Sequence, residues 1–194
     1  MQTSARIRRA RSDDATAIAK VHVETWRAAY AGIVPDSYLV RMTESGQAFT
    51  WRKLLGRKQA EETVLVVEAP TPERRGAPET SDSSHDIVAF GSCGVQRDST
   101  LTYKGEVFTL YVAPDWQAQG IGRQLLGALF RRLYEAGVGN AVIWVLADNP
   151  ARFFYERMGG QRIAEREQTF AGKALVETAF AWPDLEAWLN QVGV

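Results

Sequence analysis

The sequence predicts an α/β fold, because segments with strand patterns and helix patterns are interspersed along the chain. The clearest unit is an apolar, β-branched and aromatic strand over 105–112, a turn at 113–115 and a helix that begins at Gly120. That helix repeats apolar residues every three or four positions, which is the spacing of one helical face. A nearly all-apolar run over 140–147 is typical of a buried central strand.

Length and composition are those of a globular domain. The chain has 194 residues, enough for a full hydrophobic core, and we expect residues 1–194 to form a single domain. Hydrophobic residues make up 45% of the chain and charged residues 24%, which argues against disorder. The 23 basic and 23 acidic residues cancel, so we expect no nucleic-acid partner.

The single cysteine excludes an intrachain disulfide and a cysteine-rich zinc site, and we expect no metal. Cys93 lies in the strand pattern 91–95, where a buried, inert thiol is favoured over a nucleophile. No apolar run approaches the ~18 residues of a membrane span. The N-terminal residues lack the apolar core of a signal peptide. We therefore expect a cytoplasmic protein with no membrane partner.

The first half of the chain begins with a strand over 5–11 and a helix that Ser12 caps. That helix closes at Gly32, and its apolar face carries Ile18, His22, Trp26 and Tyr30. We expect His22 to be a core or cleft-wall residue rather than a catalyst.

A second helical region is expected over 35–57, followed by strands over 63–68 and 87–95. The segment 69–86 between these strands has three prolines and charges of both signs, so we expect a flexible surface loop.

In the second half, Gly137 ends the helix after Gly120. Asn149 is expected to cap a short helix whose first residue is Pro150. A hairpin of strands 161–169 and 175–182 follows, and a last helical segment covers 183–192.

The loop before Gly120 has the physical features of a pyrophosphate site. The first amides of a helix lack intrahelical acceptors and carry the positive end of the dipole, and glycines allow close approach of a ligand. A Walker loop needs Lys and then Ser or Thr after its second glycine, but Arg123 follows Gly122 here. A dinucleotide-binding loop needs a third glycine where this chain has Leu125. The remaining pattern is Gln117-x-x-Gly120-x-Gly122, with a purely structural turn as the alternative.

This pattern resembles the acetyl-CoA signature of the GNAT N-acetyltransferase superfamily, Gln/Arg-x-x-Gly-x-Gly/Ala. A second segment is similar to the family as well, with a strand followed by Asn149, a short helix that carries Ala151 and Tyr155, and a closing Gly159. Gly160 departs from the usual Phe. The resemblance covers about residues 7–182 and implies a central mixed, mostly antiparallel twisted sheet of about six to seven strands, flanked by helices.

The resemblance also implies site residues. Asn149 would bind the pantetheine arm, or act only as a helix cap. Arg152 would reach a phosphate, or pair with Glu156 at the surface. Trp26 and Tyr30 would line the acceptor pocket. The pantetheine would contact Leu110, Tyr111 and Val112, and the pyrophosphate Gln117, Ala118, Gln119, Gly120, Ile121, Gly122 and Arg123.

For catalysis, the acceptor amine must lose a proton, because an amine with a pKa near that of lysine is mostly charged at pH 7. The resemblance assigns this role to Glu106, with an ordered water and an exposed strand-end glutamate as alternatives. Tyr155 would protonate the leaving thiolate, or serve only as a helix-face aromatic.

The implied function is transfer of an acetyl group from acetyl-CoA to a primary amine by direct attack on the thioester. The acceptor would be a small molecule or a peptide, and a homodimer is compatible with the sequence. Two alternatives remain: a non-catalytic acyl-CoA-binding regulatory module on the same fold, and a nucleotide-binding regulator, which the failed Walker and dinucleotide patterns disfavour.

Overall fold

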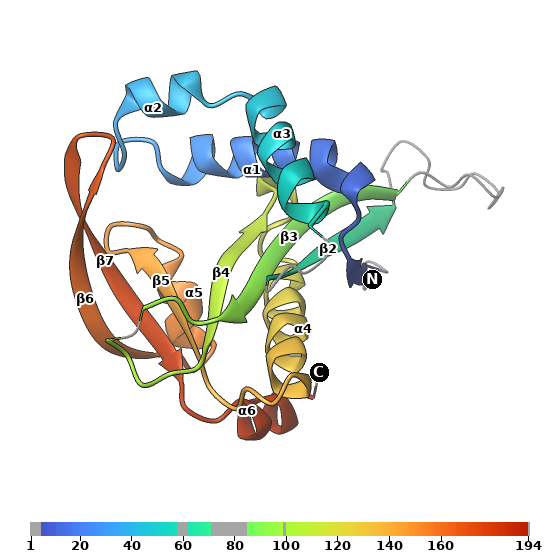
Figure 1. The fold of residues 1–194 in the computed structure, drawn as a ribbon, viewed down its shortest axis with the longest axis vertical. Helices are drawn as coiled ribbons and strands as arrows, with labels where there is room; N and C mark the ends of the chain where they lie inside the picture. The colour runs from blue at the N-terminus through green and yellow to red at the C-terminus, as the bar shows by residue number, and fades with distance from the viewer. Residues whose placement is uncertain (1–4, 58–61, 71–84, 99, 194) are drawn as a thin grey trace, which may run out of the picture.

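The computed structural model describes residues 5–57, 62–70, 85–98 and 100–193 (Figure 1). Seven strands form one sheet in the order β1-β2-β3-β4-β5-β7-β6. All neighbouring strands are antiparallel except β4 and β5, which are parallel, so the expected mixed sheet is confirmed. The strands are β1 (Arg6–Arg9), β2 (Thr63–Pro70), β3 (His85–Val95), β4 (Gly105–Val112), β5 (Ala141–Leu146), β6 (Gln161–Phe170) and β7 (Lys173–Trp182).

Helices cover both faces of this sheet. The helix α4 packs on one face, where its Leu125, Leu126 and Phe130 are fully buried against β3, β4 and β5. The helices α1 and α3 pack on the other face, with Ile18 and Trp51 against Phe90. The helices are α1 (Ala15–Ala29), α2 (Asp36–Arg41), α3 (Glu44–Leu55), α4 (Ile121–Glu135), α5 (Arg152–Arg157) and α6 (Leu185–Val192).

The strands β4 and β5 separate soon after they meet. They share only two residue pairs, Gly105 with Ala141 and Glu106 with Val142. Beyond these pairs β4 stays bonded to β3, whereas β5 stays bonded to β7 as far as Leu146 and Glu177. The edges of β4 and β5 that face each other are therefore open toward the C-terminal ends of both strands (Figure 1).

A β-bulge in β4 sets which side chains face α1. Ser92 pairs with Thr109 and Cys93 pairs with Val107, so Phe108 is the extra residue. Side chains alternate along a strand, and the bulge shifts that alternation by one. As a result Glu106 points to the same face of the sheet as Thr109 and Tyr111.

Local details differ from the expectations at two helix starts. Ser12 does not cap α1, because residues 12–14 form a 3-10 turn and α1 begins at Ala15. The Asp14 carboxylate instead accepts from the Arg11 amide at 2.6 Å and binds Arg8. The helical region 35–57 is two helices, and Thr43 caps the second by accepting from the Gly46 amide at 3.2 Å.

The turns also differ from the expectations. The β6–β7 turn has two residues, because Phe170 pairs with Lys173. Ala171 and Gly172 both have positive φ, at 49° and 83°, which is the geometry of a type I′ hairpin turn. Of the expected loop 69–86, both ends are strand, and the rest lies outside the described residues.

Among the residues that the structure describes, no helix is long and apolar enough to cross a membrane.

Candidate active site

The loop before α4 presents a row of backbone amides. Ala118 and Gly120 have positive φ, at 57° and 84°, and α4 begins directly afterwards at Ile121. Within the described part of the chain, no backbone amide of residues 118–123 donates a hydrogen bond, whereas the backbone amide of Gln117 donates to the Pro114 carbonyl. Alternating left-handed residues and a helix start together make an anion-binding concavity. No atom lies within 4 Å of the position that a Gly120 Cβ would occupy, so the site is open there.

The polar side chains of this loop bind the protein itself. The Gln117 amide group donates to the Val112 carbonyl at 3.0 Å, and that of Gln119 donates to the Asp115 carbonyl at 3.0 Å. Gln117 therefore holds the loop on the end of β4. Gly122 lies under the Phe154 ring, which a Cβ would approach to 3.4 Å, so this glycine lets α4 pack closely on α5.

The two arginines expected near phosphate are anchored to backbone. Arg123 donates to the Val192 carbonyl at 3.2 Å, and Arg152 donates to the Ala147 carbonyl at 2.9 Å. The Arg152 guanidinium also lies over the Phe153 ring, 4.7 Å from its centre. Between the described residues, no ion pair joins Arg152 to Glu156. The alternative in which Arg152 pairs with Glu156 is therefore wrong.

Asn149 is buried at the end of β5, with 5% of its surface exposed. Its Oδ1 accepts from the Ala151 amide at 2.9 Å. The helix α5 begins at Arg152 rather than at Pro150, so Asn149 caps the turn that precedes the helix and not the helix itself. Because Oδ1 is occupied, the Nδ2 donor is the end of the side chain that remains for other partners.

Tyr155 extends from α5 into the core that also contains Val107 of β4 and Val145 of β5. Its ring packs against Phe154, Phe180 and Trp182, and only 4% of the residue is exposed. Across the described residues, its hydroxyl makes no hydrogen bond. Burial raises the pKa of Tyr155 far above neutral pH, so the hydroxyl keeps its proton.

Trp26 of α1 and Tyr30, which follows α1 directly, lie on the face of the sheet that α1 covers. The Trp26 indole N–H donates to the Tyr111 hydroxyl at 3.0 Å, and the Trp26 and Tyr30 rings lie 4.5 Å apart. Burial raises the pKa of Tyr30, and burial followed by the neighbouring Tyr30 raises the pKa of Tyr111. The phenols of Tyr30, Tyr111 and Tyr155 are therefore neutral at pH 7.

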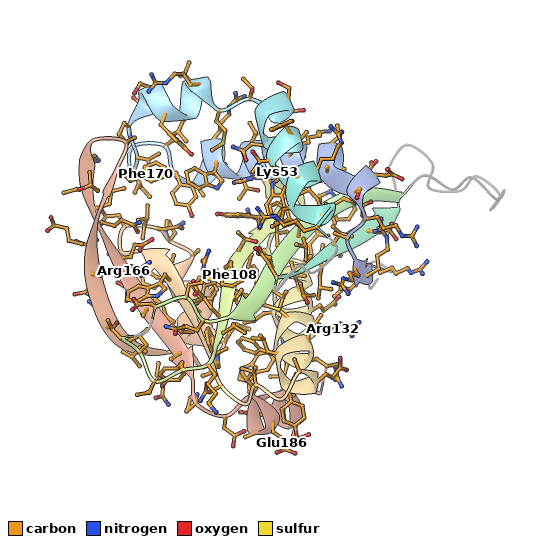
Figure 2. All side chains as sticks on the ribbon, viewed as in Figure 1. Lys53, Phe108, Arg132, Arg166, Phe170 and Glu186 are labelled. Carbon is orange, nitrogen blue, oxygen red and sulfur yellow. The ribbon has the colours of Figure 1, made fainter. Side chains whose placement is uncertain are left out.

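The turn of the β6–β7 hairpin closes over these aromatic residues. Phe170 lies 4.6 Å from the Tyr38 ring and 5.9 Å from the Trp26 ring. The Lys173 ammonium donates to the Ile33 carbonyl at 2.7 Å, which ties the hairpin to the α1–α2 connection. Figure 2 shows Phe170 at this end of the hairpin, beside α2.

His22 lies among aromatic side chains of α1, α3, β3 and β4. Its Nδ1 accepts from the Trp51 indole N–H at 3.1 Å, and its ring stacks on Tyr111 at 5.3 Å. Burial lowers the pKa of His22 to about 4, so the imidazole is neutral at pH 7. The expectation of a structural histidine is confirmed.

Glu106 lies where β4 and β5 last touch, and it is only 5% exposed. Arg97 binds both of its oxygens: the backbone N–H and Nε donate to Oε2 at 3.1 and 3.4 Å, and Nη2 donates to Oε1 at 2.9 Å. The Arg97 guanidinium rests on the Phe108 ring at 3.9 Å. The alternative of an exposed strand-end glutamate is therefore wrong.

A second charged group on this face was missed by the sequence analysis. Arg166 donates to Glu177 at 2.8 Å and to Asp98 at 3.1 Å, and its guanidinium lies 4.0 Å above the Trp144 ring (Figure 2). The only signal in the sequence is an acid and a base at alternating positions of two expected strands. Such a pattern is typical of any solvated sheet face.

Cys93 is buried, and burial raises the pKa of its thiol to about 12, which fits the expected inert cysteine. In the described ranges, no three His, Cys, Asp or Glu side chains are grouped as metal ligands.

Sequence comparisons find acetyltransferases similar to this chain. The family model described as "Acetyltransferase (GNAT) family" matches residues 41–160. The "Uncharacterized N-acetyltransferase YuaI" of Bacillus subtilis (strain 168) is 30% identical over 181 residues, which cover 93% of this chain and 94% of that protein. The "[Ribosomal protein bS18]-alanine N-acetyltransferase" of Haemophilus influenzae is 30% identical over 87 residues, 45% of this chain and 56% of that protein.

Solved structures share the fold. The PaiA N-acetyltransferase from Thermoplasma acidophilum, in complex with coenzyme A, superposes with a TM-score of 0.62 at 18% identity and covers 90% of this chain and 98% of its own. The acetyltransferase YncA from Salmonella typhimurium, with its cofactor acetyl-CoA, gives 0.61 at 24% identity and covers 94% and 95%.

Proposed function

Because the chain belongs to the GNAT family and is an acetyl-CoA-dependent N-acetyltransferase, we propose that it acetylates a primary amine by direct attack of the amine on the thioester. The observation that carries this proposal is the opening between β4 and β5, which has free loop amides at one end and a buried, unpartnered phenol beside it.

Cofactor binding would use both the loop amides and the open edge of β4. The amides of residues 118–123 would accept the pyrophosphate, and the unpaired edge of β4 over Leu110–Val112 would bond the pantetheine amides. The Nδ2 of Asn149 would add a donor to the pantetheine arm. Arg123 and Arg152 keep further guanidinium N–H groups for the phosphates beyond their backbone contacts.

The acyl transfer itself needs no covalent enzyme intermediate, because a thioester is already reactive. Backbone amides at the end of β4 would stabilise the oxyanion of the tetrahedral intermediate. Tyr155 would protonate the departing thiolate, and its raised pKa favours a retained proton until that step. Proton removal by Glu106 would require Arg97 to release the carboxylate first.

The acceptor pocket would lie on the α1 face, under the β6–β7 turn. Trp26 and Tyr30 form its wall and Phe170 its cover. One relative is named for acting on the alanine of a ribosomal protein, so a peptide that begins with alanine is a suitable probe beside small amines.

A turnover screen tests the proposal. Purified protein is given acetyl-CoA with lysine, 1,4-diaminobutane or an alanine-initiated peptide, and release of free thiol is followed with each. We expect amine-dependent thiol release, and a rise in the melting temperature when CoA is added. Saturating CoA that leaves the melting temperature unchanged would contradict the cofactor site.

A further inference from the structure

The strand register places Glu177 at the C-terminal end of β5, where β4 and β5 have separated, whereas Glu106 lies at the last pair that joins these strands. Glu106 pairs with Val142 near the start of β5, whereas Glu177 pairs with Leu146 at its end. Those two positions on β5 are four residues apart, about 13 Å along a strand. Asn149 and α5, which carries Tyr155, follow directly after Leu146.

Glu177 also lies on the face where we place the acceptor. Ile143 and Val145 of β5 belong to the core under α4, so the alternating Leu146 points to the α1 face. Leu146 indeed packs against the cluster that contains Tyr30 and Leu175. Paired residues on neighbouring strands share a face, so the Glu177 side chain lies beside this cluster.

A hydrogen bond from Arg166 orients the Glu177 carboxylate through one of its two oxygens. Arg166 Nε donates to Oε2 at 2.8 Å, and within the described residues Oε1 accepts no hydrogen bond. Arg166 is itself fixed, because Asp98 accepts from its Nη1 at 3.1 Å and Trp144 lies beneath it. Glu106 differs, because Arg97 engages both of its oxygens.

Electrostatics agree with this placement. Burial is the largest cause of the raised pKa of Tyr30, and the negative charge of Glu177 adds to the rise. A through-space effect of this kind falls with distance, so it fits a carboxylate on the same side of the sheet as Tyr30.

We propose that Glu177, rather than Glu106, binds the ammonium group of the acceptor and takes its first proton. This inference rests on the proposed amine acetylation. The ammonium gives one proton to Oε1, and the neutral nitrogen attacks the carbonyl carbon, so that a C–N bond forms. The C–S bond then breaks, Tyr155 gives its proton to sulfur, and the second proton lost from nitrogen restores the phenol. Glu177 passes its proton to water.

The charged and titratable groups around Glu177 are few among the described residues. Arg166 of β6 pairs with it, Asp98 of the β3–β4 connection pairs with Arg166, and Tyr30, just after α1, feels its charge. On β5 its neighbour Leu146 is uncharged.

The test compares two amide substitutions, Glu177→Gln and Glu106→Gln, with the most active amine of the screen above. The ratio kcat/KM is measured from pH 6 to pH 9.5, and the dissociation constant for acetyl-CoA is measured alongside. We expect Glu177→Gln to lower kcat/KM about ten- to a hundredfold at pH 7. The defect shrinks toward high pH, where free amine is present without a base. Glu106→Gln, which leaves Arg97 with a neutral partner, lowers kcat/KM less than Glu177→Gln does and by the same factor at every pH.

Glu177→Asp keeps the carboxylate and controls for loss of the Arg166 contact; it retains the wild-type pH profile even if its rate is lower. A Glu177→Gln defect that is equal at every pH, or a larger defect in Glu106→Gln, would overturn the assignment. If acetyl-CoA binds but no amine is bound or acetylated, the Glu177 inference fails together with the acceptor proposal. If acetyl-CoA itself does not bind, the cofactor proposal fails instead.

Discussion

The Trp26 indole donates to the Tyr111 hydroxyl at 3.0 Å across 85 positions of the chain, which ties α1 to β4 beside the cleft. Trp26 also contacts Phe170, so one side chain links the three elements that surround the proposed acceptor pocket.

We predict that Trp26→Phe raises the KM for the acceptor several-fold and leaves acetyl-CoA affinity unchanged. Phenylalanine keeps an aromatic ring but removes the N–H donor, which costs stability about 1 kcal/mol. Trp51→Phe is a matched control, because it removes an indole bond of 3.1 Å to His22 behind the pocket. Steady-state kinetics that rank the two variants alike would show that Trp26 has no special role.

Gly120→Val should abolish CoA binding in a protein that remains folded. The position has open space around it, but its φ of 84° is strained for a β-branched residue, so the loop amides would be reoriented. Gly137→Val is the matched control, since Gly137 has a φ of 79° and open space at the far end of α4. Calorimetric titration with CoA should separate the two variants; equal affinities would argue against the loop as pyrophosphate site.

Tyr155→Phe should lower kcat about tenfold to a hundredfold, with the acetyl-CoA dissociation constant within a few-fold of the wild type. General acids typically contribute ~10²–10⁴-fold, and a thiolate leaves readily without help. Tyr134→Phe, which removes an exposed hydroxyl on α4, should be silent. An unchanged kcat would leave Tyr155 as a packing residue, and a collapse of binding would make it a support of the cleft.

The lowered pKa of His22 predicts that the free energy of unfolding decreases in mild acid. Its pKa is about 4 when folded and about 6.5 when unfolded, so the unfolded chain binds the extra proton between these values. The contribution of neutral His22 to the free energy of unfolding is complete above pH 6.5. It decreases by about 3 kcal/mol as the pH falls to 4. Urea unfolding at several pH values measures it, and His22→Gln should flatten the curve in this window. A parallel curve for the variant would mean that other groups dominate.

The sequence was informative where function depends on local pattern. The strand over 105–112, the Gly120 turn and the following helix are local features, and all three are observed. The conformation of the loop before α4 was therefore predictable, because it depends on neighbouring residues. The confinement of β4–β5 pairing to two pairs was not predictable from spacing alone, since it depends on the register of four strands.

The charged groups show the limit more clearly. Glu106 was expected from its place at the start of the strand, but its burial depends on Arg97, which reaches it from a connection with no distinctive pattern. Glu177 was not expected at all. Its orientation depends on Arg166, and Arg166 is fixed by Asp98 from 68 positions away. Contacts between distant, individually ordinary residues leave no trace in a single sequence.

The two-pair junction of β4 with β5 has a mechanical consequence. It divides the sheet into a block of β1–β4 and a block of β5–β7, which share few backbone hydrogen bonds of their own. A ligand whose amides bond to β4 while its thioester end lies beside α5 would connect the two blocks and restrict their relative motion. The amides of β5 and β7 would then open together with those of β4, and their hydrogen exchange would slow as one cooperative unit when the cleft is filled.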